Sequence, residues 1–408
     1  MIVPSIDLMN GKAVQLERGK RKVLERDDVR ELAVRFGRYG QVALIDLDAA
    51  LGRGDNRPLI KELCRTVQAY VGGGIRTPEC AYEYLRAGAT HVIIGTAASA
   101  EFFARLPRRA SMVAVDASAG RVTVRGWTES VAETPVQRAA RLGRSCAGVL
   151  YTAVDREGVF GGADMATAAA LREVVEGKLI IAGGIWRAEE IKALDRLGAD
   201  AQVGMALYNG RLDPATVFAQ LMAFERTDGL IPTVVCDAGS GRVRMLAYSN
   251  AESLQMSLRQ GVGAYYSRSR RRIWIKGETS GNRQELVRVE ADCDRDTLCF
   301  YVRQSGPSCH TGAARCFGTD AFTWHELVSR IASRASADPL DSFTARVLAD
   351  PRLLSAKLGE EAAEVAGAES HDDVAWEVAD LLYFASVKMQ ASGVSIDDVM
   401  AQLRSRAT

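Results

Sequence analysis

Two stretches, QAYVGGGI at residues 68–75 and KLIIAGGI at residues 178–185, decide the fold of the first half of the chain. Each is a short apolar run that ends in consecutive glycines, a pattern typical of a buried parallel strand followed by a turn into a helix. The two Gly-Gly-Ile segments lie 110 positions apart. Three further pairs recur at a spacing of 109 positions: Asp7 and Asp116, Asp46 and Asp155, and Gly95 and Gly204. This repetition indicates that the first half of the chain consists of two copies of one structural unit.

Short apolar runs alternate with helical patterns from residue 1 to about residue 222. Eight such βα units in two equivalent halves predict a (β/α)8 TIM barrel, which we assign to residues 1–224. In this fold the carboxyl ends of all strands lie on one face. We therefore expect the chemistry of the segment on that face.

Two further segments follow the polar joint FERTDG at residues 224–229. Alternating runs and glycine turns predict a mainly β, α+β domain over residues 228–320. From residue 324 to residue 408 the pattern changes to long amphipathic helices, which predicts an all-α domain. The chain is thus expected to hold three domains.

The composition is that of an ordinary globular protein, with 52 basic and 51 acidic residues among 408. This balance argues against a nucleic-acid partner. No run of 18 apolar residues is present, so no membrane segment is expected, and we expect a cytoplasmic protein. The eight cysteines are spread along the chain, and thiols in a reducing compartment are more often buried hydrophobes or metal ligands than disulfides.

Two opposed carboxylates form the first candidate site. Asp7 is expected at the end of the first strand and Asp116 at the end of the fifth, so the repeat places them on opposite sides of the barrel mouth. Such a pair can act as base and acid, although either residue alone could simply cap a turn. Glycine-rich turns at helix starts suit phosphate groups, and two copies predict two phosphate sites. The candidate phosphate-binding residues are Gly73, Gly74, Gly95, Thr96, Gly183, Gly184 and Gly204.

The stretches VPSIDLMNGKAVQL (3–16), VDASAGRVTVRGW (115–127) and VGMALYNG (203–210) resemble phosphoribosylformimino-aminoimidazole carboxamide ribotide isomerase. The resemblance implies that a base moves the C2 proton of the substrate, an acid opens the ribose ring, and no cofactor is required. By resemblance Asp7 is the base and Asp116 the acid, Thr152 lies nearby, and Arg125 and Trp127 belong to a loop that covers the substrate.

Two positions depart from the isomerase pattern: Glu157 stands where the family usually has Asp, and Gln15 where it usually has Arg. The TAVDREG stretch (152–158) also leans toward the related cyclase barrel of imidazole glycerol phosphate synthase. Two alternatives therefore stay open. The barrel could be a cyclase-like domain that needs an ammonia-delivering partner, or an inactive scaffold.

The second candidate site combines thiols and carboxylates. Cys293, Cys309 and Cys316 lie among polar and glycine residues, which suits zinc held by three sulfurs with one open position. Asp292, Asp294 and Asp296 would share one face of a strand by period two and supply the clustered oxygens that Mg²⁺ accepts, with solvated strand charge as the alternative. The thiols that we instead interpret as structural are Cys64, Cys80, Cys146, Cys236 and Cys299.

MLAYSN (245–250), WIKGETSGN (274–282), DCDRD (292–296) and the spacing to the last two cysteines closely resemble phosphoribosyl-AMP cyclohydrolase from residue 231 to residue 317. The resemblance implies a zinc-activated water that opens the purine ring. His310 would move the proton or play a structural role. In the family the ligands come from both chains of a dimer, so a homodimer or higher oligomer is expected.

The third candidate site is a carboxylate face on two helices. Glu360, Glu361 and Glu364 lie within one turn, and Glu377 and Asp380 are spaced i, i+3 on the next helix. Such stripes are usually solvated surface. Because these carboxylates flank apolar positions without alternating lysines, like charges cluster, and we expect Mg²⁺ to relieve the repulsion.

SFTARVL (342–348), AKLGEEAAEV (356–365) and EVADLLYF (377–384) resemble phosphoribosyl-ATP pyrophosphatase. The resemblance implies Mg²⁺-assisted attack of water on a triphosphate, with Lys357 as a phosphate contact or an ordinary surface lysine. The three resemblances are consecutive steps of histidine biosynthesis on small phosphoribosyl nucleotide substrates. We therefore expect a multifunctional enzyme that uses Zn²⁺ and Mg²⁺.

Overall fold

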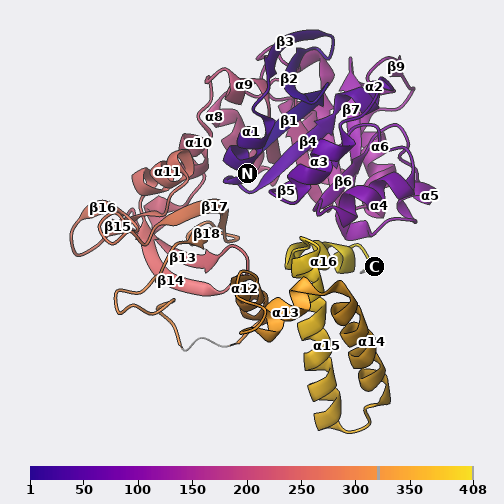
Figure 1. Cartoon of the computed structure of the whole chain (residues 1–408). Helices are drawn as coiled ribbons and strands as arrows, with labels where there is room; N and C mark the ends of the chain where they lie inside the picture. The colour runs from indigo at the N-terminus through magenta and orange to yellow at the C-terminus, as the bar shows by residue number, and fades with distance from the viewer. Residues whose placement is uncertain (319–321, 407–408) are drawn as a thin grey trace. The chain divides into compact units, whose positions relative to one another are not determined.

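The first half of the chain is a closed ring of parallel strands, as predicted (Figure 1). In the computed structural model, which describes residues 1–318 and 322–406, β10 pairs with both β7 and β11 and thereby closes the ring. The strands follow one another around the ring in chain order. They are β1 (Ile2–Met9), β4 (Gln41–Asp46), β5 (Gln68–Gly72), β6 (His91–Ile94), β7 (Ser111–Ser118), β10 (Gly148–Ala153), β11 (Lys178–Ala182) and β12 (Asp200–Val203).

The barrel has an inner and an outer hydrophobic layer. Inward-pointing side chains such as Val3, Tyr70 and Met112 fill the ring, so the barrel is a packed core and not a pore. Outward-pointing side chains pack under the surrounding helices. These helices are α1 (Val29–Gly37), α3 (Arg57–Cys64), α4 (Pro78–Arg86), α5 (Ala100–Phe103), α6 (Pro135–Leu142), α7 (Met165–Val174), α8 (Ala188–Arg196) and α10 (Pro214–Gln220).

Two excursions leave the barrel at equivalent places in its two halves. The hairpin β2 (Lys12–Glu17) and β3 (Arg21–Arg26) follows β1, and the hairpin β8 (Arg121–Val124) and β9 (Glu129–Ser130) follows β7. Both arise at carboxyl ends of strands, so both can cover the same mouth. Short helices, α2 (Leu47–Leu51) and α9 (Met205–Tyr208), follow β4 and β12 on this face.

The middle segment is a mixed four-stranded sheet with one helix and a separate hairpin. In the sheet, β13 and β18 are parallel and the outer neighbours are antiparallel. Its buried side chains continue the hydrophobic cluster that covers the outside of the barrel. The elements are β13 (Ile231–Asp237), β14 (Val243–Ser249), α11 (Ala251–Gln260), β15 (Ala264–Ser267), β16 (Arg272–Ile275), β17 (Gln284–Ala291) and β18 (Leu298–Gln304).

The carboxyl-terminal segment is helical, as predicted. Residues 318–400 form a compact unit of their own, distinct from the unit that holds the barrel and the mixed sheet. Its small core contains Ile331, Val347, Leu354, Phe384 and Val387. The helices are α12 (Trp324–Arg334), α13 (Phe343–Ala349), α14 (Pro351–Gly367), α15 (His371–Ala391) and α16 (Ile396–Arg404), the last of which runs past residue 400.

The exact domain limits stay a prediction. The barrel and the mixed sheet share one compact unit, and the predicted ends at residues 320 and 408 lie outside the described residues. Over residues 1–318 and 322–406, no helix combines the length and apolar character that a membrane span requires.

Candidate active sites

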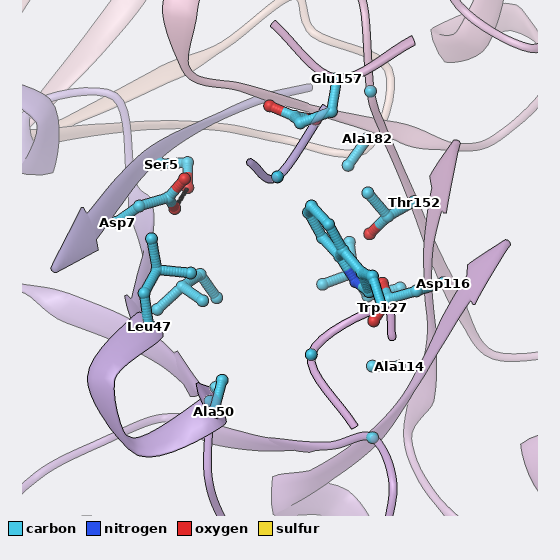
Figure 2. A pocket seen from close by; sticks show the side chains of 18 of the residues that line it. Ser5, Asp7, Leu47, Ala50, Ala114, Asp116, Trp127, Thr152, Glu157 and Ala182 are labelled. Carbon is cyan, nitrogen blue, oxygen red and sulfur yellow. Dashed lines mark hydrogen bonds between the residues drawn. The ribbon is translucent and has the colours of Figure 1, made fainter. Parts of the chain in front are cut away.

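A pocket opens at the carboxyl ends of the barrel strands and brings the predicted acid and base together (Figure 2). Asp7 and Asp116 project from β1 and β7 on opposite walls of this pocket. Thr152, from β10, and Trp127 lie beside Asp116. The diametric arrangement expected from the repeat is therefore present.

Burial raises the pKa of both carboxyl groups of the pair. It raises the pKa of Asp7 to about 6, although the Ser5 hydroxyl donates a hydrogen bond of 2.8 Å to this carboxylate and opposes the rise. Burial also raises the pKa of Asp116, against hydrogen bonds from Thr152 and Trp127. A raised pKa makes a carboxyl group better suited to exchange protons with a substrate at physiological pH.

Glu157 adds a third carboxyl group to the same pocket (Figure 2). Burial, together with the negative charges of Asp7 and Asp116, raises its pKa to about 8, so Glu157 holds a proton at neutral pH. The sequence drew attention to Glu157 only as a departure from a family pattern. Its place one short turn after β10, at the carboxyl end of a barrel strand, was the signal for a site residue.

The paired glycines of the two turns are required by close packing. A Cβ atom on Gly73 would lie 2.2 Å from the Asp46 carbonyl oxygen, and one on Gly183 would lie 2.5 Å from that of Ala153. Both glycines, and the next one in each turn, have positive φ angles between 69° and 98°. The two turns are thus the same structure repeated, and they leave backbone N–H groups at the pocket, where phosphate could bind.

The other candidate phosphate-binding residues line the pocket as well. Gly95, Thr96 and Gly204 lie at the ends of β6 and β12. The Thr96 hydroxyl accepts a hydrogen bond of 2.9 Å from the backbone N–H of Arg125. Gln15 is buried and lies close to Gly204: a Cβ atom on Gly204 would lie 2.6 Å from the Oε1 atom of Gln15.

The segment Arg125–Trp127 adopts three consecutive left-handed residues, with φ angles of 53°, 64° and 68°. Such a run is strained for the two residues that carry side chains, and surrounding contacts must hold it. Gly126 packs against Leu51, and the indole of Trp127 lies in the pocket next to Asp116. The predicted covering loop therefore lies over the barrel mouth.

The second candidate site lies on loops of the mixed sheet. The prediction that Asp292, Asp294 and Asp296 lie on a strand is wrong, because β17 ends at Ala291 and these residues form the turn before β18. The turn nevertheless brings one oxygen of each carboxylate within 4.8 Å of the others. The three side chains converge because the chain folds back, and their hard oxygen donors suit Mg²⁺.

Cys309 and Cys316 lie close together after β18. The hydroxyl of Thr311 donates to the Cys309 Sγ at 3.1 Å, and this bond, assisted by Cys316, holds the pKa of the Cys309 thiol below its usual range. Burial raises the pKa of Cys316. One thiol is thus prepared for deprotonation, as a zinc ligand must be. The His310 ring nitrogen Nδ1 lies 3.9 Å from the Cys309 sulfur.

Cys293 is exposed, in the aspartate turn. Within residues 1–318 and 322–406 of one chain, it does not join Cys309 and Cys316 in a group of three donor atoms close enough for a single ion. The single chain therefore brings together two of the three predicted zinc ligands. The thiols predicted to be structural include Cys64, Cys146 and Cys236, which are buried.

The third candidate site is assembled between α14 and α15. Glu360, Glu361 and Glu364 form one group of close carboxylates, and Glu361 also converges with Glu377 and Asp380 across the two helices. Burial raises the pKa of Glu361, and repulsion from Glu364 and Asp380 adds to the rise. The same causes raise the pKa of Glu377. Clustered carboxylates that repel one another are a suitable donor set for a divalent cation.

One lysine does meet this cluster. Lys357 forms an ion pair of 2.8 Å with Glu360, on the next turn of α14, and lies 3.9 Å from Glu361. The inner carboxylates Glu364, Glu377 and Asp380 have no lysine or arginine three or four residues away on α14 and α15. Lys357 therefore offsets the charge at one edge of the cluster only.

A barrel with opposed carboxylates, a mixed sheet with a thiol pair and an aspartate turn, and a helical unit with clustered carboxylates together define a multidomain enzyme. Three family models match the chain in this order: histidine biosynthesis protein over residues 1–213, phosphoribosyl-AMP cyclohydrolase over 245–318, and phosphoribosyl-ATP pyrophosphohydrolase over 324–407. The chain belongs to the histidine biosynthesis protein family, and its second half belongs to two families of hydrolases.

Curated relatives agree with these matches. The histidine biosynthesis bifunctional protein HisIE of Escherichia coli is 41% identical over 190 residues, which cover 45% of this chain and 94% of that protein. The protein of the same name from Vibrio cholerae is 39% identical over 208 residues, covering 48% and 99%. The histidine biosynthesis trifunctional protein of Neurospora crassa is 40% identical over 198 residues, 48% of this chain but only 22% of that longer protein.

Proposed function

We propose that this chain carries out three consecutive steps of histidine biosynthesis. The helical unit hydrolyses phosphoribosyl-ATP to phosphoribosyl-AMP and pyrophosphate. The mixed-sheet segment opens the adenine ring of phosphoribosyl-AMP, and the barrel converts the resulting aminoaldose into the aminoketose. The observation that carries the proposal is the match of three family models, in order, to segments that each contain a separate cluster of chemically suitable side chains.

In the barrel, Asp7 and Asp116 face the substrate from opposite walls of the pocket. Asp116 donates a proton to the ring oxygen of the ribose, which breaks the bond from that oxygen to C1. Asp7, with a pKa of about 6, is mostly ionised at neutral pH and removes the proton from C2. Asp7 returns its proton to C1, and the 2-hydroxyl group gives its proton back to Asp116 as it becomes the ketone, which completes the aldose-to-ketose conversion. The two glycine turns bind the phosphate groups at the ends of the substrate.

Glu157 can take part in this step as a hydrogen-bond donor, because it is protonated at neutral pH in the same pocket. A neutral carboxyl group can donate to a substrate oxygen without adding another negative charge to the pocket. The Glu157 side chain therefore supports an active barrel and speaks against an inactive scaffold.

In the mixed-sheet segment, Cys309 and Cys316 would hold Zn²⁺ with Cys293, and Asp292, Asp294 and Asp296 would hold Mg²⁺. Bound zinc supplies a hydroxide near neutral pH. In the reaction, water adds to the ring carbon of the adenine, and the bond from this carbon to the neighbouring ring nitrogen breaks. His310, next to Cys309, would move the proton to that nitrogen.

In the helical unit, Glu360, Glu361, Glu364, Glu377 and Asp380 would hold Mg²⁺ against the triphosphate. The ion withdraws charge from the phosphate oxygens when it is bound. Water then attacks the phosphorus nearest the ribose, and the bond to the pyrophosphate oxygen breaks. Lys357, beside Glu360, is placed at the edge of this cluster and can contact a phosphate group.

We also propose that the protein is a homodimer or a higher homo-oligomer. One chain brings together only Cys309 and Cys316 of the three thiols, so Cys293 would complete the site of a second copy. In addition, α15 exposes apolar side chains that a second helical unit could cover, including Trp376, which is 71% exposed, and Leu382.

The test is to incubate the purified full chain with phosphoribosyl-ATP, Mg²⁺ and Zn²⁺ and to separate the products by chromatography before mass spectrometry. Aminoketose supports all three activities. Accumulation of the aminoaldose, which has the same mass, would show that the barrel is not an isomerase. Conversion of separately added aminoketose after addition of a glutaminase partner would identify the cyclase-like alternative.

A further inference from the structure

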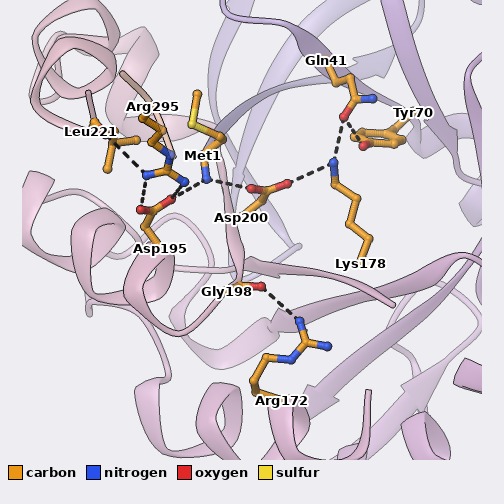
Figure 3. Close-up of polar contacts among 10 residues, drawn as sticks. All are labelled: Met1, Gln41, Tyr70, Arg172, Lys178, Asp195, Gly198, Asp200, Leu221 and Arg295. Atoms are coloured by element: carbon orange, nitrogen blue, oxygen red, sulfur yellow. Dashed lines mark hydrogen bonds and ion pairs between the residues drawn. The ribbon is translucent and has the colours of Figure 1, made fainter. Parts of the chain in front are cut away.

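In the turn that carries the three aspartates, Arg295 contacts the barrel (Figure 3). Its guanidinium group binds both carboxylate oxygens of Asp195, on α8 of the barrel, with Nη2 at 2.5 Å from Oδ1. The backbone oxygen of Arg295 accepts a hydrogen bond of 3.0 Å from the N–H of Ala223, just after the last barrel helix. Both the side chain and the backbone of Arg295 are therefore fixed by residues of the barrel.

Asp195 is a firm anchor. Its side chain is only 13% exposed, and it also pairs with the amino group of Met1 at 3.0 Å. Burial alone would raise the pKa of Asp195, but the hydrogen bonds from Arg295 and the charge of the Met1 amino group hold that pKa below its usual range. Because the contact is bidentate and largely sheltered from solvent, it restricts Arg295 more than a surface ion pair would.

The turn itself needs such support. Arg295 has a φ angle of 66°, a left-handed conformation that costs free energy for a residue with a side chain. The turn also holds the carboxylates of Asp292, Asp294 and Asp296 together, which repel one another. Its internal polar contacts are few: the backbone N–H and side chain of Asp292 bond to Thr297 at 3.1 Å, and Asp296 accepts from the Thr297 hydroxyl.

We infer that Arg295 is a positioning residue, through which the barrel holds the aspartate turn in the shape that binds a divalent cation. This inference rests on the proposed Mg²⁺ site at Asp292, Asp294 and Asp296. The guanidinium group of Arg295 is bound by Asp195, so its effect on the cation is indirect. It acts on the metal site of one domain through a carboxylate of another, so the barrel contributes to the cyclohydrolase step as well as to its own reaction.

The sign of the effect separates positioning from simple electrostatics. Arg295 is a cation between two of the aspartates, so as a point charge it weakens the binding of Mg²⁺, and its removal would strengthen binding. As a positioning residue it does the opposite, because its removal releases the turn. Arg295→Ala therefore gives opposite results under the two mechanisms.

The experiment measures hydrogen–deuterium exchange of the full chain during a Mg²⁺ titration and reads only the peptide that covers the aspartate turn. This local readout is independent of Mg²⁺ bound to the helical unit and of catalytic activity. We expect the Mg²⁺ midpoint of this peptide to rise about tenfold in Arg295→Ala, the lower end of the effect of removing a residue that orients metal ligands. Asp195→Asn, which changes only the barrel side of the contact, should also raise the midpoint.

Arg303→Ala is the matched control. Arg303 lies on β18 at the end far from the turn and pairs at 3.2 Å with exposed Glu285 of the same sheet. In Arg303→Ala, the Mg²⁺ midpoint of the peptide that covers the aspartate turn should equal that of the unmodified chain. An unchanged or lower midpoint in Arg295→Ala, with normal exchange in the rest of the sheet, would overturn the positioning role alone. If Mg²⁺ does not protect the turn even in the unmodified chain, both the proposed Mg²⁺ site and this inference fail.

Discussion

Gly19 and Trp127 are in contact across the mouth of the barrel: a Cβ atom on Gly19 would lie 2.2 Å from Cε3 of the indole ring. The two residues belong to the excursions that follow β1 and β7, the equivalent strands of the two halves. Trp127 in turn hydrogen-bonds to Asp116. The position of the indole beside the proposed catalytic acid thus depends on the absence of a side chain at residue 19.

Gly19→Ala should displace Trp127 from the pocket. We expect kcat/KM of the isomerase step to fall between about tenfold and 100-fold, since small misplacements of groups around a reacting centre have effects of this size. The two hydrolytic steps should be unaffected. Steady-state kinetics of each step, together with tryptophan fluorescence, measure the effect.

Gly11→Ala is the control for this variant. Gly11 also has a positive φ angle, 75°, but no atom lies within 4 Å of the Cβ position. Both substitutions therefore strain the backbone, but only the new methyl group at residue 19 would collide with Trp127. Equal losses of isomerase activity in the two variants would mean that backbone strain, and not the contact with Trp127, is responsible.

Asp7→Asn should remove the base of the isomerase. The rate of the isomerase step should fall between about 10²-fold and 10⁴-fold, the loss expected for a general base. The aminoaldose formed from phosphoribosyl-ATP should then accumulate. Asp27→Asn is a suitable control, because Asp27 is an exposed carboxylate, paired with Lys12, on the same half of the barrel. Equal loss of all three activities in Asp7→Asn would contradict the assignment of three independent sites.

Glu157→Gln should change how the stability of the barrel depends on pH. Because the pKa of Glu157 rises from 4.5 to about 8 on folding, the folded state keeps a proton that the unfolded state loses between these values. The free energy of unfolding therefore falls as pH rises through this window. Below the window, the buried Glu157 carboxyl group costs no stability. Gln resembles the protonated form, so the variant should lose less stability between pH 5 and pH 8, by a few kcal/mol at most.

Thermal unfolding at several pH values measures this dependence. Glu176→Gln is the control, since the Glu176 side chain is 82% exposed. If the pH profiles of the unmodified chain and Glu157→Gln are parallel, the Glu157 carboxyl group ionises normally in the folded barrel.

The sequence predicts the barrel well because its information is local and repeated. The spacing that relates Asp7 to Asp116 fixes both the strand and the end of the strand on which each residue lies, and the structure places them on opposite walls of one pocket. The glycine turns are equally local, since a left-handed φ and close packing at Gly73 and Gly183 leave no alternative residue.

Other features depend on contacts that no local pattern records. The aspartates were expected on a strand, but the strand ends at Ala291, and the turn is held partly by a barrel residue about 100 positions earlier, Asp195. Likewise, Glu157 becomes a protonated pocket residue only because the fold buries it next to Asp7 and Asp116. Burial and long-range pairing determine both features, and neither follows from residue spacing.

Cys309→Ser should remove a zinc ligand and stop the reaction sequence at phosphoribosyl-AMP. We expect the zinc content of the purified chain to fall, because a hydroxyl group is a much poorer ligand for zinc than a thiolate. Cys80→Ser provides a control, as Cys80 is a partly exposed thiol on the barrel helix α4. Continued ring opening by Cys309→Ser, or unchanged zinc content, would refute the assignment of this ligand.

Glu361→Gln should have opposite effects on stability and on catalysis in the helical unit. Glu361 belongs to both groups of close carboxylates, and its neighbours Glu364 and Asp380 repel its charge. Without Mg²⁺, removal of this charge should raise the thermal midpoint of the unit. With Mg²⁺, the unmodified chain should gain stability by binding the ion, and the variant should gain less, because it has lost a ligand.

The same variant should hydrolyse phosphoribosyl-ATP at least about tenfold more slowly at a fixed Mg²⁺ concentration, since the loss of a ligand weakens metal binding. Glu369→Gln, an exposed carboxylate in the turn between α14 and α15, should behave like the unmodified chain in both measurements. A Mg²⁺-dependent rise of the midpoint that is as large in Glu361→Gln as in the unmodified chain would place the ion elsewhere. Stability and hydrolysis together therefore test whether the clustered carboxylates are a metal site or an ordinary charged surface.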